Sequence, residues 1–149
     1  MSITIDDIIK LAIEKEDNAY KLYSGVLDKI NDPGAKAMIS QLAKEELEHK
    51  EALEKLDVEK VKKVEPQKIE DLKIAEFLQD REIRDTSSLQ DVLVFAMKRE
   101  KEAYEFYSKF AAEMVDPDIK NVLESFAQQE KKHKRDIEAF YDDVIYQED

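Results

Sequence analysis

The chain has no cysteine, and its 149 residues include only two glycines and three prolines. Without cysteine, these residues cannot form disulfides, thiolate metal sites, iron–sulfur clusters or a cysteine nucleophile. The scarcity of glycine and proline leaves too few turn residues for an all-β fold. Long stretches rich in Ala, Leu, Glu and Lys contain no helix breaker, which predicts an all-α protein.

Basic residues are also in deficit, with 24 Lys and Arg against 36 Asp and Glu, a net charge of −12. This balance argues against nucleic acid and anionic membranes as partners, but it does not oppose the binding of cations. No apolar run approaches the roughly 18 residues of a membrane span. The N-terminus, MSITIDDIIK, lacks the basic region and apolar core of a signal peptide, so we expect a cytoplasmic protein.

The sequence contains an internal repeat. With a shift of 84 positions, residues 4–56 align with residues 88–140 without a gap, and 15 of the 53 pairs are identical. The matched positions include helix starts, turns and both histidines of the chain. The repeat therefore predicts two similar halves.

Each half is expected to be a helical hairpin. Thr4 and Ser88 are candidate N-caps of the first helices, and the Asp-Pro pairs at 32–33 and 116–117 begin the second helices. Helical periodicity extends to about residues 30 and 114 in the first helices, and to about 56 and 144 in the second. The turns are short, so the helices of each hairpin should be antiparallel neighbours.

Residues 57–87 join the two hairpins and begin with a charged stretch that contains Pro66. Apolar residues between 69 and 78 have the spacing of a short helix. A connection of this length can cross from one end of a bundle to the other. We predict a single domain over 1–149, an antiparallel four-helix bundle with one long crossover between the second and third helices.

The predicted buried face of every helix is apolar or aromatic except at one level. The polar residues at that level are Glu16, Glu46, His49, Glu100, Glu130 and His133. Lone ionised carboxylates are costly in a core, and four at one level would repel one another. Two divalent cations would balance their four negative charges.

The spacing supports this interpretation. Residues three apart are neighbours on a helix, so each Glu-x-x-His pair lies on one face. The separation from Glu16 to Glu46 is 30 residues, as is that from Glu100 to Glu130. A single such motif in a Glu-rich chain would be an ordinary, partly exposed surface feature. Two copies that contain the only two histidines favour a metal site.

These motifs resemble those of the rubrerythrin branch of the ferritin-like di-iron superfamily. They read EDNAYKLY at 16–23, ELEH at 46–49, EKEAYEFY at 100–107 and EKKH at 130–133. The resemblance implies a ferritin-like bundle with two iron ions. It implies that Glu46 and Glu130 bridge both ions, with Glu16 and His49 on one and Glu100 and His133 on the other. The same donor set also suits manganese or zinc.

Two departures from the family pattern bear on activity. Rubrerythrins usually carry a rubredoxin-like domain with four cysteines, so here electrons should come from a separate partner, such as a rubredoxin-like protein. They also have a further ligand Glu three residues after the third-helix Glu, where this chain has Ala103. The resulting symmetric pattern is closer to the bacterioferritin ferroxidase centre, which weakens the expectation of peroxidase activity.

Tyr23 and Tyr107 lie seven residues after the single Glu of each half, on the same face. They either hydrogen-bond ligand carboxylates from the second shell or pack as ordinary bundle residues. Glu45, Glu48 and Glu51 are expected on a solvated face.

We expect a cytoplasmic di-iron protein, as a homodimer, that reacts with hydrogen peroxide or dioxygen as a peroxidase or ferroxidase. The alternatives are an iron-binding or storage protein, and a structural metal bundle without turnover.

Overall fold

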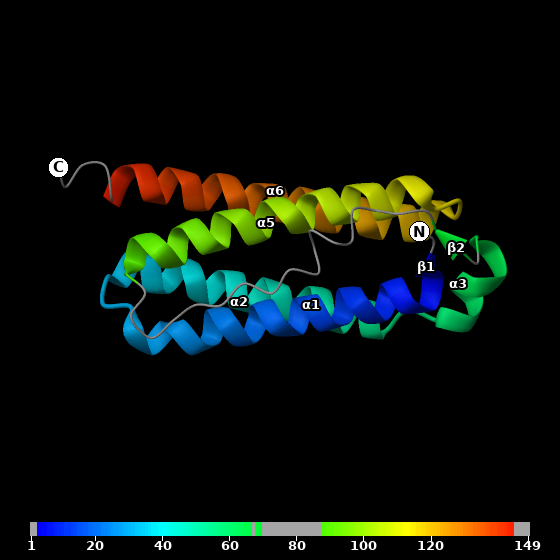
Figure 1. Cartoon of the computed structure of the whole chain (residues 1–149), viewed down its shortest axis with the longest axis horizontal. Helices are drawn as coiled ribbons and strands as arrows, with labels where there is room; N and C mark the ends of the chain where they lie inside the picture. Colours follow the sequence, from blue (N-terminus) through cyan, green and yellow to red (C-terminus); the bar gives the residue numbers. More distant parts are fainter. Residues whose placement is uncertain (1–2, 67, 70–87, 145–149) are drawn as a thin grey trace.

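Four long helices form the body of the molecule in the computed structural model, which describes residues 3–66, 68–69 and 88–144. They are α1 (Ile5–Val26), α2 (Pro33–Glu54), α5 (Leu89–Glu113) and α6 (Pro117–Val144). The first hairpin consists of α1 and α2, and the second of α5 and α6. All four helices lie along one long axis, and the helices of each hairpin run in opposite directions (Figure 1).

The direction of the helices confirms the predicted crossover. Helix α2 ends at the end of the bundle opposite to the one where α5 begins (Figure 1). The described ends of the connection therefore lie at opposite ends of the bundle, as in a ferritin-like fold. The short helix predicted between residues 69 and 78 lies outside the described residues, apart from Ile69.

The start of this connection is more ordered than the sequence suggested. Residues predicted as a charged linker form helix α3 (Val58–Val64), because the Asp57 side chain caps it by accepting from the Lys60 N–H at 3.2 Å. Val61 of α3 is buried in the core. Strands β1 (Ile3–Thr4) and β2 (Lys68–Ile69) form a short antiparallel pair that the sequence analysis did not anticipate.

The helix starts follow the sequence signals. Thr4 accepts from the Asp7 N–H at 3.1 Å, and Ser88 forms a reciprocal capping box with Asp91. Asp32 caps α2 through the Ala35 N–H at 2.8 Å, and Asp116 caps α6 through the Ile119 N–H at 3.1 Å. Helix α1 ends earlier than predicted, at Val26, and continues as the 3-10 turn η1 (Leu27–Lys29).

A buried carboxylate ties the connection to the second hairpin. Glu65, directly after α3, accepts from the Val115 N–H at 2.5 Å and from the Asp116 N–H at 2.7 Å. These two donors belong to the turn between α5 and α6. Glu65 thereby satisfies backbone groups that a helix start leaves without partners.

The hydrophobic core consists of two clusters. One contains Ile8, Leu53 and Phe110, and the other contains Ile39 and Ile137. The six polar residues predicted from the sequence lie along the same buried faces, between these clusters in chain order on each helix. No helix in the described part of the chain is long and apolar enough to cross a membrane.

Candidate metal centre

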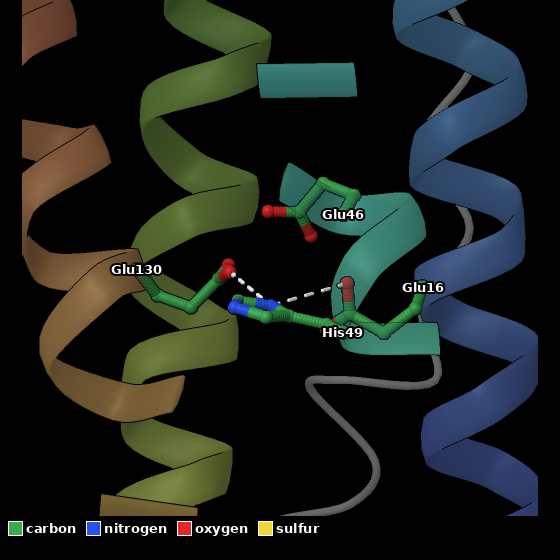
Figure 2. Close-up of side chains that lie close together, drawn as sticks. All are labelled: Glu16, Glu46, His49 and Glu130. Carbon is green, nitrogen blue, oxygen red and sulfur yellow. Dashed lines mark ion pairs between the residues drawn. The ribbon is translucent and has the colours of Figure 1, made fainter. Parts of the chain in front are cut away.

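All six predicted polar residues are buried and meet inside the bundle. The four carboxylates are 0% exposed and the two imidazoles 3% exposed. One carboxylate comes from each long helix, and α2 and α6 each add a histidine one turn later. Figure 2 shows Glu16, Glu46, His49 and Glu130 pointing toward one another from three helices. The helical period thus brings together residues more than 80 positions apart in sequence.

The ligand atoms form two overlapping groups, in each of which they lie within 4.8 Å of one another. One group adds Glu16 and His49 to the shared Glu46 and Glu130, and the other adds Glu100 and His133 to the same pair. This division matches the arrangement that the resemblance implied.

Both imidazoles turn the same nitrogen toward the carboxylates. His49 Nδ1 lies 3.1 Å from Glu130 Oε1 and 3.7 Å from Glu16 Oε2. His133 Nδ1 lies 3.4 Å from Glu46 Oε1 and 3.5 Å from Glu100 Oε2. Nδ1 is therefore the nitrogen available for coordination in both histidines.

Several of these buried atoms make ion-pair contacts but no hydrogen bond of good geometry within the described residues, which is costly in a core. They include Glu16 Oε2, both Glu46 oxygens, Glu130 Oε1 and both histidine Nδ1 atoms. Carboxylate oxygen and imidazole nitrogen are donors that divalent iron, manganese and zinc accept. The residues present therefore fit a pair of metal ions.

Two tyrosines donate hydrogen bonds to Glu16 and Glu100, the two carboxylates that the ligand groups do not share. The Tyr23 hydroxyl on α1 donates to Glu100 Oε1 at 2.8 Å, and the Tyr107 hydroxyl on α5 donates to Glu16 Oε1 at 2.6 Å. The sequence left these tyrosines open between hydrogen bonding and packing. Each bond crosses from one hairpin to the other, so it fixes both a carboxylate and the contact between the hairpins.

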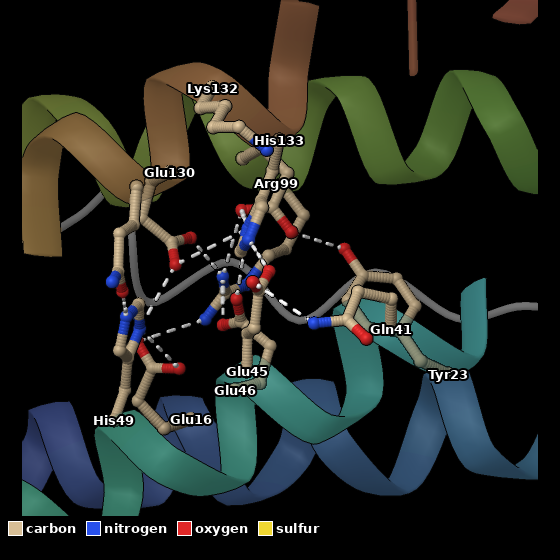
Figure 3. Close-up of polar contacts among 12 residues, drawn as sticks. Glu16, Tyr23, Gln41, Glu45, Glu46, His49, Arg99, Glu130, Lys132 and His133 are labelled. Atoms are coloured by element: carbon tan, nitrogen blue, oxygen red, sulfur yellow. Dashed lines mark hydrogen bonds and ion pairs between the residues drawn. The ribbon is translucent and has the colours of Figure 1, made fainter. Parts of the chain in front are cut away.

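Arg99 is a member of the cluster that sequence reasoning missed. Its Nη1 lies 2.5 Å from Glu130 Oε2, 2.6 Å from Glu46 Oε2 and 3.3 Å from Glu100 Oε2, and its Nη2 lies 3.4 Å from Glu16 Oε1. The side chain is only 11% exposed. Figure 3 shows Arg99 among the polar side chains of the centre. One feature of the sequence could have indicated Arg99: a basic residue directly precedes the single Glu in both halves, Lys15 before Glu16 and Arg99 before Glu100.

The cluster divides its carboxylates into two kinds. Burial raises the pKa of Glu46 to about 7 against the effect of Arg99, and burial with the Glu100 charge raises the pKa of Glu130 well above its usual range. Burial also acts to raise the pKa of Glu16 and Glu100, but Arg99 and hydrogen bonds within the cluster outweigh it. The pKa of Glu100 falls to about 2, and that of Glu16 is also lowered. The two carboxylates shared by the groups are thus the ones whose pKa values are raised, and a metal ion would have to displace any proton that they carry.

The outer nitrogen of each histidine contacts the opposite hairpin. His133 Nε2 contacts the Glu45 carboxylate, and His49 Nε2 contacts the Gln129 side-chain oxygen. The sequence analysis placed Glu45 on a solvated face, which is wrong: its side chain is 25% exposed and lies against α6. Glu45 precedes Glu46 on the helix and reaches the neighbouring helix at the edge of the buried face.

Ala103, where the resemblance indicated a missing Glu, is fully buried. Its methyl group cannot coordinate a metal, and Ala19 is its equivalent in the first hairpin. The ligand set of the two halves is therefore symmetric.

Comparison with known proteins gives a family. A family model for rubrerythrin matches residues 7–141. The chain belongs to the rubrerythrin family. A search of curated proteins found no match. This rubrerythrin-family chain is similar to the solved structure of a hypothetical protein from Pyrococcus furiosus, with 26% identity, a TM-score of 0.70, and coverage of 90% of this chain and 85% of the other.

A second solved structure, from Thermotoga maritima, carries the name of a ferritin-like diiron-carboxylate protein. It is 20% identical, has a TM-score of 0.71, and the match covers 91% of this chain and 93% of the other. At this identity the likeness supports the ferritin-like fold and nothing finer.

Proposed function

We propose that this rubrerythrin-family chain binds two iron ions and reduces hydrogen peroxide or dioxygen with electrons from an external donor. The observation that carries the proposal is the pair of overlapping ligand groups that share Glu46 and Glu130. A structural site for one ion would need only one such group. Membership of the rubrerythrin family supports iron as the metal.

Each of the six residues has a distinct part in this proposal. Glu46 and Glu130 belong to both groups, so they would bridge the ions. Glu16 with His49, and Glu100 with His133, would each complete the shell of one ion. Tyr107 and Tyr23 orient the two unshared carboxylates through the hydrogen bonds described above, which keeps the remaining oxygens directed inward.

When bound, two ferrous ions supply the two electrons that reduce hydrogen peroxide, or that begin the reduction of dioxygen in ferroxidase chemistry. An apolar cluster lies on each side of the site along the helices, which would limit the access of water to it. Arg99 adds a buried positive charge beside the carboxylates, which would stabilise negative charge that develops at the site. The shared carboxylates can accept or release protons, because burial raises their pKa values.

The electrons that return the site to the ferrous state must come from elsewhere. These 149 residues contain no cysteine, so a four-cysteine rubredoxin centre cannot form within them. We therefore propose a separate electron donor, for which a rubredoxin-like protein has suitable chemistry. We also propose that the chain forms a homodimer, which analytical ultracentrifugation would test.

One experiment separates the candidate functions. The protein is loaded anaerobically with ferrous iron and mixed with oxygen or with peroxide, while ferric absorption is followed. Rapid oxidation with turnover on addition of a reductant supports the proposal. Oxidation by oxygen with many irons retained per chain supports storage, and no oxidation by either supports a structural site.

The choice of oxidant has its own test at Ala103. Because no carboxylate is available there, each ion would have one unshared Glu and one His, and we expect only a weak preference for peroxide over oxygen. Ala103→Glu should raise the ratio of the peroxide rate to the oxygen rate, provided that the variant still binds two metals. A wild-type preference for peroxide by orders of magnitude would contradict this expectation.

A further inference from the structure

The two metal positions have equivalent ligands but different outer contacts. His49 and His133 are 84 residues apart, and so are Glu45 and Gln129, the residues that contact their outer nitrogens. At this pair of equivalent positions one half has a carboxylate and the other a neutral amide. Figure 3 shows Glu45 and His133 within the polar network of the centre.

Both contacts fix the imidazole in the same tautomer. An oxygen beside Nε2 accepts a hydrogen bond from Nε2–H, so that Nδ1, once it has lost its proton to an incoming metal, would present its lone pair to the carboxylate cluster. In His133 the acceptor is Glu45 Oε2, and in His49 it is Gln129 Oε1. Glu45 is itself held by the Gln41 amide, which donates to its other oxygen at 3.2 Å.

The two acceptors differ in strength. A hydrogen bond to an ionised carboxylate is roughly twice as strong as one to a neutral amide. A carboxylate on the outer nitrogen also makes a histidine a better electron donor to its metal, and such partners change metal affinity by about 10- to 100-fold. His133 should therefore bind metal more tightly than His49.

The other polar contacts of the site do not produce this difference. The tyrosine bonds are equivalent, at 2.8 Å from Tyr23 and 2.6 Å from Tyr107. Arg99 contacts carboxylates of both groups. One further difference is aromatic, since His49 stacks on Phe126 at 4.4 Å between ring centroids and the equivalent position holds Leu42.

We propose that Glu45 and Gln129 make the two metal positions unequal, so that the position of His133 and Glu100 fills before that of His49 and Glu16. Glu45 and Gln129 act through the histidines, as positioning residues, and neither belongs to the two ligand groups. This inference rests on the proposed function only in requiring two metal positions.

The two histidines are the only ones in the chain, which allows a direct test by nitrogen NMR of the imidazoles. Protein labelled with ¹⁵N-histidine is titrated with zinc alone, a diamagnetic probe, from zero to two equivalents. The His49→Gln variant assigns the spectrum. Below one equivalent, we expect Nδ1 of His133 to shift to its metal-bound position with at least about tenfold preference over His49.

Three variants exchange the outer contacts without changing a proposed ligand. Glu45→Gln and Gln129→Glu each make the halves alike and should remove most of the preference. The double variant Glu45→Gln/Gln129→Glu should reverse it, so that His49 fills first. Phe126 is unchanged in all three, so a reversal cannot come from the aromatic stack. Circular dichroism before titration checks that each variant is folded.

The outcomes separate this inference from the proposed function. Zinc binding at both histidines together in the wild type, or an unchanged order in the double variant, would overturn the inference and leave the two-metal centre in place. A wild-type spectrum in which neither histidine responds to zinc would overturn both.

Discussion

The two hairpins of the bundle agree at the six candidate ligands and the two tyrosines, and they differ at the residues around them, including Arg99, whose equivalent is Lys15. Both hairpins contribute one single Glu, one Glu-x-x-His motif and one tyrosine that bonds the other hairpin's Glu. The outer contacts differ: Glu45 against Gln129, and Phe126 on His49 where the other half has Leu42. The six candidate ligands are thus repeated in the two halves, while the residues that contact them differ. Equivalent ligands can therefore differ in metal affinity.

The largest expected effect is on metal binding, and it should differ between a carboxylate that belongs to both ligand groups and one that belongs to a single group. Glu46→Gln alters a residue of both ligand groups, so affinity should fall by at least about 100-fold at both positions. Glu16→Gln alters one group only, so one metal should remain after dialysis against a weak chelator. Elemental analysis gives the count per chain. Equal losses in the two variants would contradict the assignment of Glu46 as shared.

The next effect concerns the cation that one hairpin alone places among all four carboxylates. Arg99→Leu leaves buried carboxylates without their guanidinium partner, so the metal-free protein should lose about 3 to 5 kcal/mol of unfolding free energy. Metal affinity should rise, because a competing cation has gone. Urea unfolding and zinc calorimetry measure the two changes.

Arg99→Lys is the matched control for this experiment. Lysine keeps the charge but cannot reach several carboxylates at once, so both changes should be intermediate. A fall in metal affinity in Arg99→Leu would show that the guanidinium assists the metals rather than competing with them.

A smaller effect is expected at the turn of the second hairpin. Glu65→Gln weakens two hydrogen bonds to the Val115 and Asp116 amides and should cost about 1.5 to 3 kcal/mol of unfolding free energy. Metal content should not change. Glu59→Gln, at an exposed position of α3, is the control and should be near wild type in urea unfolding. Matching losses in the two variants would remove the special role of Glu65.

The smallest expected difference compares the two tyrosines. Tyr23→Phe and Tyr107→Phe each remove one hydrogen bond to a buried carboxylate, at a cost of about 1 to 3 kcal/mol in unfolding free energy. Because the bonds are equivalent under the repeat, the two losses should agree within about 1 kcal/mol. A much larger loss in one variant would show that the hairpins already differ at the carboxylates.

The sequence predicted the bundle, the caps and the meeting of six polar residues because each depends on helical period and local spacing. Glu16 and Glu100 interrupt an apolar stripe, and such an interruption is visible without a structure. Arg99 was missed because it lies beside the stripe and reaches the centre through a long side chain. Glu45 was misplaced because its partner, His133, is on another helix, and periodicity within one helix carries no information about that contact.

The connection was predicted less well for a similar reason. The stretch around α3 is highly charged, and its order depends on the Asp57 cap, on burial of Val61 and on the bonds from Glu65 to a turn some 50 residues away. The last of these is a tertiary contact of a single carboxylate, and composition could not reveal it.

The central claim is that two metal ions share one pair of carboxylates, and diffraction from iron-loaded crystals at the iron absorption edge tests it most directly. We predict two anomalous peaks per chain, one beside Glu16 and His49 and one beside Glu100 and His133, with Glu46 and Glu130 between them and Arg99 moved from its position among the four carboxylates. A single peak, or peaks away from these six residues with Arg99 still in contact with all four carboxylates, would contradict the account.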